Sequence, residues 1–253
     1  MHKRNFFVIL AASILLLASC AKEGPTGPTG PAGPVFYGTI SGHVSLYDKY
    51  GSEVLTGLNV VNVTLSTSSI PATLDASGGY KFVNVGTGTY TITANADSDY
   101  AGTVLNNVNF ISGNLYKDVK LSAIPDSFII SFAASLNSGS LSDSLALTVM
   151  PDTRVRKCIV FVGLSNVSSN PSLYKLKYVV NIPGTTGAVP YTIPYMIPRQ
   201  DLLDAALASG TAVYYAAYSY VVNDVSVYED ITTGNNVYNA VNVHPIVDSA
   251  IVP

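Results

Sequence analysis

The chain repeats one pattern that strongly restricts its fold: short runs in which apolar and polar residues alternate, each closed by glycine. Within residues 88–95, GTYTITAN, every second side chain is apolar or aromatic. The faces expected to be buried in two such runs are Val61, Val63 and Leu65, and Tyr90, Ile92 and Ala94. Period-two alternation is typical of a half-buried strand, whereas an amphipathic helix repeats every three to four residues. The chain is therefore predicted to be all-β.

A neighbouring run, GYKFVNVG, follows the same rule. Tyr80, Phe82 and Asn84 are expected on one face, with Val83 and Val85 on the other. Glycines flank this run on both sides. They favour tight turns, because glycine adopts positive φ without the steric cost of a Cβ atom.

The composition indicates a folded chain and excludes one class of partner. Of the 253 residues, 48% are hydrophobic and 11% are charged. That is enough apolar material for one large core or two smaller ones, and too little charge for a disordered chain. Without residues 1–19 the chain keeps 11 of its 13 basic residues and all 16 acidic ones, a formal net charge of −5. A mildly acidic chain without a basic cluster is not expected to bind nucleic acid.

Residues 1–19 have the features of a signal peptide. Two basic residues precede an apolar stretch at 6–17, which is too short to span ~30 Å of hydrocarbon as a helix. The sequence LASC that ends at Cys20 resembles the bacterial lipobox. This resemblance implies that the Cys20 thiol receives a diacylglycerol and that fatty acids such as palmitate anchor the mature chain to a membrane. The alternative is an ordinary secretory signal in which Cys20 is incidental.

The residues after the cysteine predict location and spacing. CAKE, at 20–23, is similar to the export signal of some Bacteroidetes lipoproteins, which implies the cell envelope, the outer membrane and its exposed face. Residues 20–35 then place glycine at every third position from Gly24 to Gly33, each followed by proline. We expect a stiff polyproline-II spacer of about 40 Å, at ~3.1 Å per residue. A short collagen triple helix that joins three chains is the alternative.

Residues 36–122 carry the motifs of a known family. The segments ISGHV, VNVTL, DASGGYKF and GTYTI begin at positions 40, 61, 75 and 88. They resemble the carboxypeptidase regulatory-like family, whose pattern contains G-x-V, an apolar strand, D-x-x-G-x-[FY]-x-F and G-x-Y; this chain has one additional glycine, Gly79. The resemblance implies a transthyretin-like β-sandwich of seven or eight strands, close in fold to carbohydrate-binding modules and usually non-enzymatic.

Residues 126–253 contain further strand-like runs between turn residues, which predict a second β-sandwich. One short helix is expected at 201–209, with Gly210 as its stop. The sequence GTAVYY that follows is similar to the late-strand region of a fibronectin type III-like domain. Residues 123–125 form the expected hinge between the two domains, since a proline favours extended geometry in the residue before it.

The sequence lacks the usual motifs of catalytic and metal sites. No H-E-x-x-H, C-x-x-C, G-x-S-x-G, P-loop or EF-hand pattern occurs. His43, His244 and Cys158 are each expected to be structural. Asp97 and Asp99 come nearest to a calcium loop, but a solvated turn is preferred because Ca²⁺ requires six to eight oxygen ligands. We therefore predict no catalytic residue, no metal and no cofactor.

Tyrosine is the abundant aromatic residue, and four tyrosines cluster in the run VYYAAYSYVV. Alternation places Tyr214, Tyr218 and Tyr220 on one face of a strand and Tyr215 on the other. We identify these four as candidate ligand-facing residues, because exposed rings stack on sugars or anchor protein partners. Burial of the rings in a core is the alternative.

Together these features predict a non-enzymatic, lipid-anchored lipoprotein of the cell envelope. A stiff spacer would hold its two β-sandwiches off the membrane as a binding or scaffold module for a glycan or a protein. One alternative is an accessory subunit of an outer-membrane receptor or adhesive complex. The other is a hydrolase with an unrecognised site.

Overall fold

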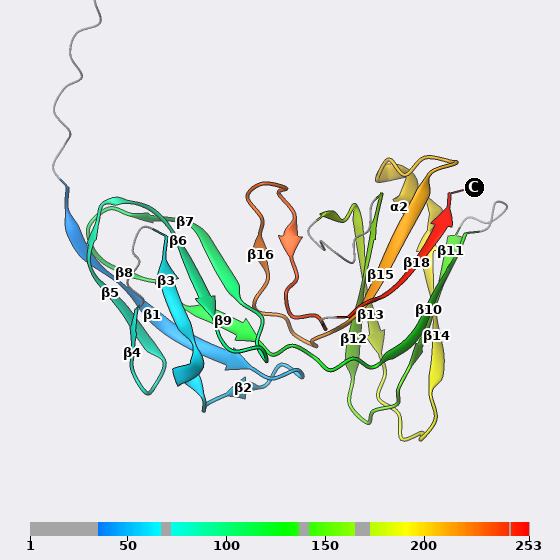
Figure 1. The fold of residues 1–253 in the computed structure, drawn as a ribbon, viewed down its shortest axis with the longest axis horizontal. Helices are drawn as coiled ribbons and strands as arrows, with labels where there is room; N and C mark the ends of the chain where they lie inside the picture. The colour runs from blue at the N-terminus through cyan, green and yellow to red at the C-terminus, as the bar shows by residue number, and fades with distance from the viewer. Residues whose placement is uncertain (1–34, 67–71, 137–141, 165–172, 243, 253) are drawn as a thin grey trace, which may run out of the picture. The chain divides into compact units, whose positions relative to one another are not determined.

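The structure is a computed structural model that describes residues 35–66, 72–136, 142–164, 173–242 and 244–252 (Figure 1). The signal peptide, Cys20 and nearly all of the glycine–proline linker lie outside the described residues. Residues Phe36–Pro253 form one compact unit. Almost every element described in this unit is a strand, so the prediction of an all-β fold is confirmed.

Two sheets are built from residues 36–122. Their elements are β1 (Tyr37–Tyr47), β2 (Glu53–Val54), a 3-10 turn η2 (Leu58–Val60), β3 (Asn62–Leu65), β4 (Thr73–Leu74), β5 (Gly79–Gly86), β6 (Gly88–Asn95), β7 (Thr103–Phe110), β8 (Gly113–Tyr116) and β9 (Val119–Ser122). In the larger sheet, β1 pairs antiparallel with β2 and β5 and parallel with β8 and β9, and β4 pairs with β5. The smaller sheet has the order β3-β6-β7.

One hydrophobic core joins these two sheets. Ile40 and Val44 of β1 are fully buried and belong to the same cluster as Val63 of β3 and Ile92 of β6. Alternation predicts one buried face from Val61, Val63 and Leu65 and another from Tyr90, Ile92 and Ala94. All six side chains are buried. The period-two pattern therefore predicts the inward faces of β3 and β6 correctly.

The alternation in β5 breaks at one residue. The pairing of β1 with β5 shifts register opposite Asn84, which adopts a left-handed backbone with φ 58°. Asn84, the residue at this bulge, is exposed, and the next residue, Val85, is buried. The prediction that Asn84 shares a face with Tyr80 and Phe82 is therefore wrong, because an extra residue in one strand exchanges the two faces beyond it.

The turn before β5 shows why the D-x-x-G sequence is needed there. Asp75 Oδ1 accepts hydrogen bonds from the backbone N–H of Ser77 and of Gly79, both at 2.9 Å, and from the Ser77 hydroxyl at 2.7 Å. These bonds, led by that of the hydroxyl, lower the pKa of the Asp75 carboxyl. Gly78 has φ 90°, and a Cβ atom there would lie 2.8 Å from the carbonyl oxygen of Val44. Glycine is thus required at this position by both backbone angle and space.

Two larger sheets and a separate pair of short strands are built from residues 129–251. Their elements are β10 (Ile129–Ser135), β11 (Ser142–Val149), β12 (Arg156–Gly163), β13 (Leu176–Ile182), β14 (Tyr191–Pro198), α2 (Arg199–Asp204), β15 (Ala212–Tyr220), the short pair β16 (Tyr228–Glu229) and β17 (Asn236–Val237), and β18 (Ile246–Ile251). One sheet has the order β10-β11-β14 and the other β13-β12-β15-β18. Leu145 and Leu147 of the first share a core with Cys158 and Val160 of the second.

The strand β12 is buried on both faces. Cys158 and Val160 face the core just described, while Ile159 and Phe161 belong to a separate cluster with Tyr218, Tyr220 and Tyr238. This explains why the run CIVFV is apolar without alternation, as expected of a strand covered on both sides. Ala101 of the preceding half of the chain packs in the same cluster, so this cluster joins the two pairs of sheets.

The segment at 123–125, expected to be a hinge, is held by backbone hydrogen bonds. The N–H of Ala123 donates to the Tyr47 carbonyl and that of Ile124 to the Asp99 carbonyl, each at 2.7 Å. Backbone hydrogen bonding therefore continues past β9 as far as Ile124. Separate folding of 36–122 and 126–253 as two domains stays a prediction.

The helix predicted at 201–209 forms as α2, but it begins and ends earlier. Its last residue is Asp204, and Ala206 follows in the left-handed conformation with φ 58°. The N–H of Ala206 donates to the Leu203 carbonyl and that of Leu207 to the Leu202 carbonyl, both at 2.9 Å, which is a Schellman motif. Gly210, the predicted stop, lies six residues beyond the end of the helix, with φ 81°.

Candidate functional site

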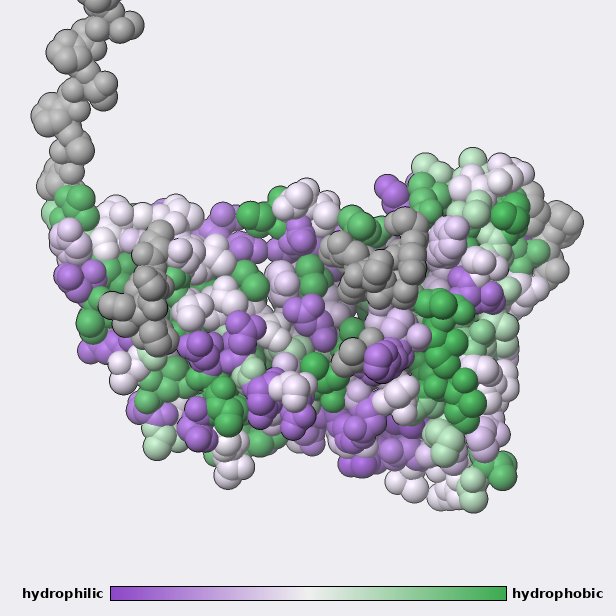
Figure 2. Space-filling model, in the orientation of Figure 1, coloured by the Kyte–Doolittle hydropathy of each residue, from purple (hydrophilic) through white to green (hydrophobic). Residues whose placement is uncertain are grey.

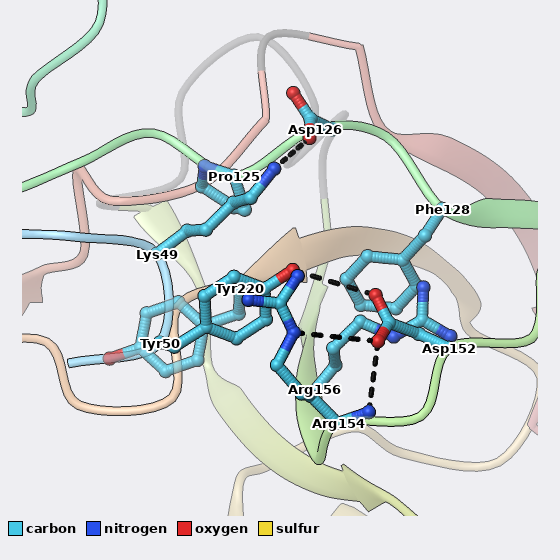
Figure 3. Close-up of a pocket in the computed structure, with 9 residues that line it drawn as sticks. All are labelled: Lys49, Tyr50, Pro125, Asp126, Phe128, Asp152, Arg154, Arg156 and Tyr220. Carbon is cyan, nitrogen blue, oxygen red and sulfur yellow. Dashed lines mark hydrogen bonds and ion pairs between the residues drawn. The ribbon is translucent and has the colours of Figure 1, made fainter. Parts of the chain in front are cut away.

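A pocket of about 240 Å³ lies where three loops meet the ends of two strands (Figure 3). It is lined by Lys49 and Tyr50 from the turn between β1 and β2, by Pro125, Asp126 and Phe128 before β10, by Asp152 and Arg154 before β12, by Arg156 at the start of β12, and by Tyr220 at the end of β15. Residues far apart in the sequence thus form one site; Tyr50 and Asp152 are separated by 102 positions.

Aspartate turns position two sides of this pocket. Asp48 Oδ1 accepts the backbone N–H groups of Tyr50 at 2.9 Å and Ser52 at 2.8 Å, which fixes the turn that carries Lys49 and Tyr50. On the opposite side, Asp152 Oδ1 accepts the N–H of Arg154 at 2.9 Å. Both are local aspartate-to-backbone bonds of the kind that stabilise turns.

Each cation of the pocket lies against an aromatic ring. The Arg154 guanidinium carbon is 3.4 Å from the centre of the Tyr50 ring, and that of Arg156 is 4.2 Å from the centre of the Phe128 ring. Lys49 Nζ is 5.8 Å from the Tyr50 ring centre. These are cation–π distances, which stabilise the cations and hold the two guanidinium planes in place.

Two carboxylates partly neutralise the three cations. Lys49 forms an ion pair with Asp126, and that hydrogen bond raises the pKa of Lys49. Arg154 Nε is 3.7 Å from Asp152 Oδ1. The backbone N–H of Arg154, followed by the charges of Arg156 and Arg154, lowers the pKa of Asp152. With all five groups ionised, the pocket has one positive charge in excess.

Arg156 is the most buried of the three cations, with 8% of its surface exposed. Its Nη2 donates to the Met150 carbonyl oxygen. Its Nε is buried and has no hydrogen-bond partner among the described residues. A buried guanidinium N–H without an acceptor is costly in free energy, so this atom is an unsatisfied donor next to the pocket.

The pocket is chemically suited to binding. The nine residues that line it include no His, Ser or Cys; its charged side chains are two aspartates, one lysine and two arginines. Over the ranges that the structure describes, no group of three or more His, Cys, Asp or Glu residues could hold a metal ion. Asp97 Oδ1 instead accepts the N–H of Asp99 at 3.1 Å, as in a turn.

Of the four candidate tyrosines, three lie in hydrophobic cores. Tyr215 faces the core that contains Phe132, whereas Tyr218 and Tyr220 belong to the cluster around Phe161. Burial is the physical reason that their rings do not present a face to solvent, although the edge of Tyr220 lines the charged pocket. Tyr215 therefore lies on the opposite face of β15 from Tyr218 and Tyr220, as alternation predicts.

Tyr214 is the one of the four that is exposed, with 39% of its surface accessible. It pairs with Ser249 of β18, between the exposed side chains of Val247 and Ile251. Figure 2 shows hydrophobic residues gathered over β18 and β10 on the face in view. A ligand-facing role for Tyr214 stays a prediction.

The other residues singled out in the sequence have structural surroundings. Cys158 is fully buried, and burial raises the pKa of its thiol. His43 Nε2 lies 2.7 Å from the Ser77 carbonyl oxygen. Cys20 lies outside the described residues, so lipid attachment there stays a prediction. No helix among the described residues is long and apolar enough to cross a membrane.

Lys49, Arg154 and Arg156 have no recognised motif in the sequence. One signal is present: in D-x-R-x-R at 152–156 the arginines are two positions apart, so an extended chain directs both to the same side. Tyr50 and Phe128 have no such signal. Their proximity depends on the third core cluster, which brings the two pairs of sheets together.

No protein-family model matches this chain, and no curated protein sequence does, so the resemblance of 36–122 to the carboxypeptidase regulatory-like family stays a prediction. Solved structures with some similarity include a "putative carbohydrate binding protein" from Bacteroides uniformis, with 14% identity and a TM-score of 0.31 over 85% of this chain and 99% of that one. DUF3823 family proteins from Parabacteroides merdae and Bacteroides ovatus have 10% and 13% identity and TM-scores of 0.26, over 88% and 74% of this chain and 100% and 93% of theirs. Likenesses of this size carry no argument about function.

Proposed function

We propose that this protein is a non-enzymatic binding lipoprotein of the cell envelope. A lipid on Cys20 would anchor it to the outer membrane, and the glycine–proline linker would hold the β-rich unit at the exposed surface. The observation that supports a binding role is the pocket at Lys49, Arg154 and Arg156. Its charged and aromatic groups converge on one cavity.

The ligand would be a glycan or a protein, bound without turnover. Aromatic rings and guanidinium groups held by turns and strand ends are suited to recognise polar ligands, because they lose little conformational freedom on binding. Arg156 is held by Phe128 and by the Met150 carbonyl, and Arg154 by Tyr50. The recognition groups are thus oriented before a ligand arrives.

The proposal is tested on the mature chain purified in detergent. An array of glycans and a pull-down of envelope proteins should each be compared with an Arg154→Gln variant. We expect a ligand that is retained by the wild type, lost or weakened in the variant, and recovered chemically unchanged. A ligand that is recovered cleaved would contradict the proposal in favour of a hydrolase.

A further inference from the structure

The net charge of the pocket indicates a narrower class of ligand than the glycan or protein of the proposed function. Three cations face two carboxylates, and the more exposed carboxylate, Asp126, has 81% of its side chain accessible. Asp152 lies close to two arginines, so one guanidinium remains without a carboxylate of its own. The arrangement therefore favours a ligand that brings one negative charge.

The geometry of the donors favours a planar anion. A guanidinium presents parallel N–H groups that match the two oxygens of a carboxylate, and such charge-assisted bonds are stronger than neutral ones. Arg156 contributes the buried Nε that lacks an acceptor. Arg154 lies at the rim with 59% of its side chain accessible, and its guanidinium carbon is 3.4 Å from the centre of the Tyr50 ring.

The size of the pocket restricts the rest of the ligand. A volume of about 240 Å³ is just below the range of about 300–1,000 Å³ typical of small-molecule sites, which suits one ring rather than an extended chain. The remaining wall is formed by Tyr50, Phe128 and the edge of Tyr220, which offer apolar contact to the C–H groups of a sugar ring.

We propose that this pocket binds the carboxylate-bearing ring of an acidic sugar, such as a uronic acid, with Arg156 and Arg154 as the carboxylate ligands and Lys49 at the rim. The inference rests on the proposed binding function and names its ligand class. Asp126 then acts as a competitor, because it occupies Lys49 and repels an anion. Binding would draw Lys49 away from Asp126 and toward the ligand.

The experiment measures binding of three matched probes to the mature chain by calorimetry: methyl glucuronide, its methyl ester and methyl glucoside. We expect the glucuronide to bind at least about tenfold more tightly than either neutral probe, because only it accepts charge-assisted hydrogen bonds. Added salt should weaken glucuronide binding, since both partners are charged.

Variants test the assignment of residues. Arg154→Gln should weaken glucuronide binding by about tenfold, whereas Asp126→Asn should strengthen it severalfold, because it removes a like charge and releases Lys49. Lys177→Gln is the matched control: it removes a cation stacked on Tyr238, 4.8 Å from the ring centre, outside the pocket lining. We expect it to leave binding unchanged. Arg154 and Asp126 are exposed, so loss of fold is not expected to account for the result.

Several outcomes would overturn the inference. Equal binding of the ester and the glucuronide would contradict a carboxylate site, as would weaker binding in Asp126→Asn. Binding of acetyl-glutamate amide in place of the glucuronide would indicate an acidic peptide ligand instead. If no sugar binds, the acidic-sugar site is rejected, while a protein or neutral glycan retained in the array or pull-down would keep the broader binding function.

Discussion

At the scale of single residues, the ion pair between Asp143 and Arg199 is the most heavily buried in the described part of the chain. Arg199 Nη2 donates to Asp143 Oδ1 at 2.8 Å, and only 1% of the Asp143 side chain is exposed. Removing one partner of a buried pair leaves the other charge in a medium of low dielectric constant. Breaking this ion pair is therefore expected to cost more free energy than the intact pair contributes to stability.

We expect Arg199→Met to lower the free energy of unfolding by about 3 kcal/mol, measured by urea denaturation. The double variant Asp143→Leu with Arg199→Met should recover most of this loss, because no charge then remains buried. Arg154→Met, at an exposed ion pair, is the control and should cost less than about 1 kcal/mol. A double variant as unstable as the single one would show that the cost is packing rather than charge.

Burial of tyrosine makes the fold sensitive to alkaline pH. Tyr218 is 3% exposed, and desolvation raises its pKa to about 12. The unfolded chain ionises this phenol near its ordinary pKa of about 10, while the folded chain keeps it neutral. Its contribution to stability is therefore present below about pH 10 and is lost as pH rises toward about 12, at roughly 1.4 kcal/mol per pH unit.

The Tyr218→Phe variant isolates this effect. Between pH 10 and 12 the wild type should lose stability more steeply than the variant, by up to roughly 1.4 kcal/mol per pH unit, in urea unfolding at fixed ionic strength. Tyr214→Phe, in the same strand but at a side chain with 39% of its surface accessible, controls for loss of a hydroxyl. Parallel curves for wild type and Tyr218→Phe would contradict the assignment.

At the scale of elements, the end of α2 contains a residue that geometry disfavours. Ala206 occupies the left-handed position of the Schellman motif, where an L-residue costs roughly 1 kcal/mol and glycine does not. Leu202 and Leu207, which accompany the motif, are both fully buried. Their burial offsets the strain and fixes the helix end before Gly210.

Ala206→Gly should therefore raise the free energy of unfolding by about 0.5–1 kcal/mol, read from the thermal midpoint or from urea denaturation. The matched control is Ala205→Gly, because Ala205 has φ −79° and ψ 8° and gains nothing from glycine. It should destabilise the protein slightly. Stabilisation by both substitutions, or by neither, would show that the backbone angle at position 206 is not the cause.

The predictable part of the fold follows from local periodicity. The alternation in β3 and β6 identifies their buried faces, because neither strand has an extra residue there; the bulge opposite Tyr90 and Ile92 lies in β7, where Asn107 has φ 56°. The prediction from alternation fails in β5 at Asn84, where a bulge inserts one residue. The only sign of this bulge in the sequence is the asparagine itself, since asparagine tolerates positive φ. The end of α2 was misplaced for a related reason: buried leucines, rather than the nearest glycine, determine it.

At the scale of the whole molecule, the candidate site is the part that sequence predicts least well. Tyrosines 215, 218 and 220 are abundant because strands favour aromatic residues, and their rings fill cores. The pocket instead combines Tyr50, Phe128 and the 152–156 loop, which become neighbours only when the third core cluster packs around Phe161 and Ala101. Local patterns carry no information about such long-range assembly.

Lipid anchoring is decided by the intact mass of the mature polypeptide from its native membrane, with fragmentation of its N-terminal peptide. We expect a chain that begins at Cys20, carries a diacylglycerol on the thiol and fatty acid on the amine, and needs detergent for release. Cys20→Ala should abolish the added mass. A mature chain with a bare Cys20 thiol that leaves the membrane in high salt alone would contradict the proposal of an envelope-anchored binding protein.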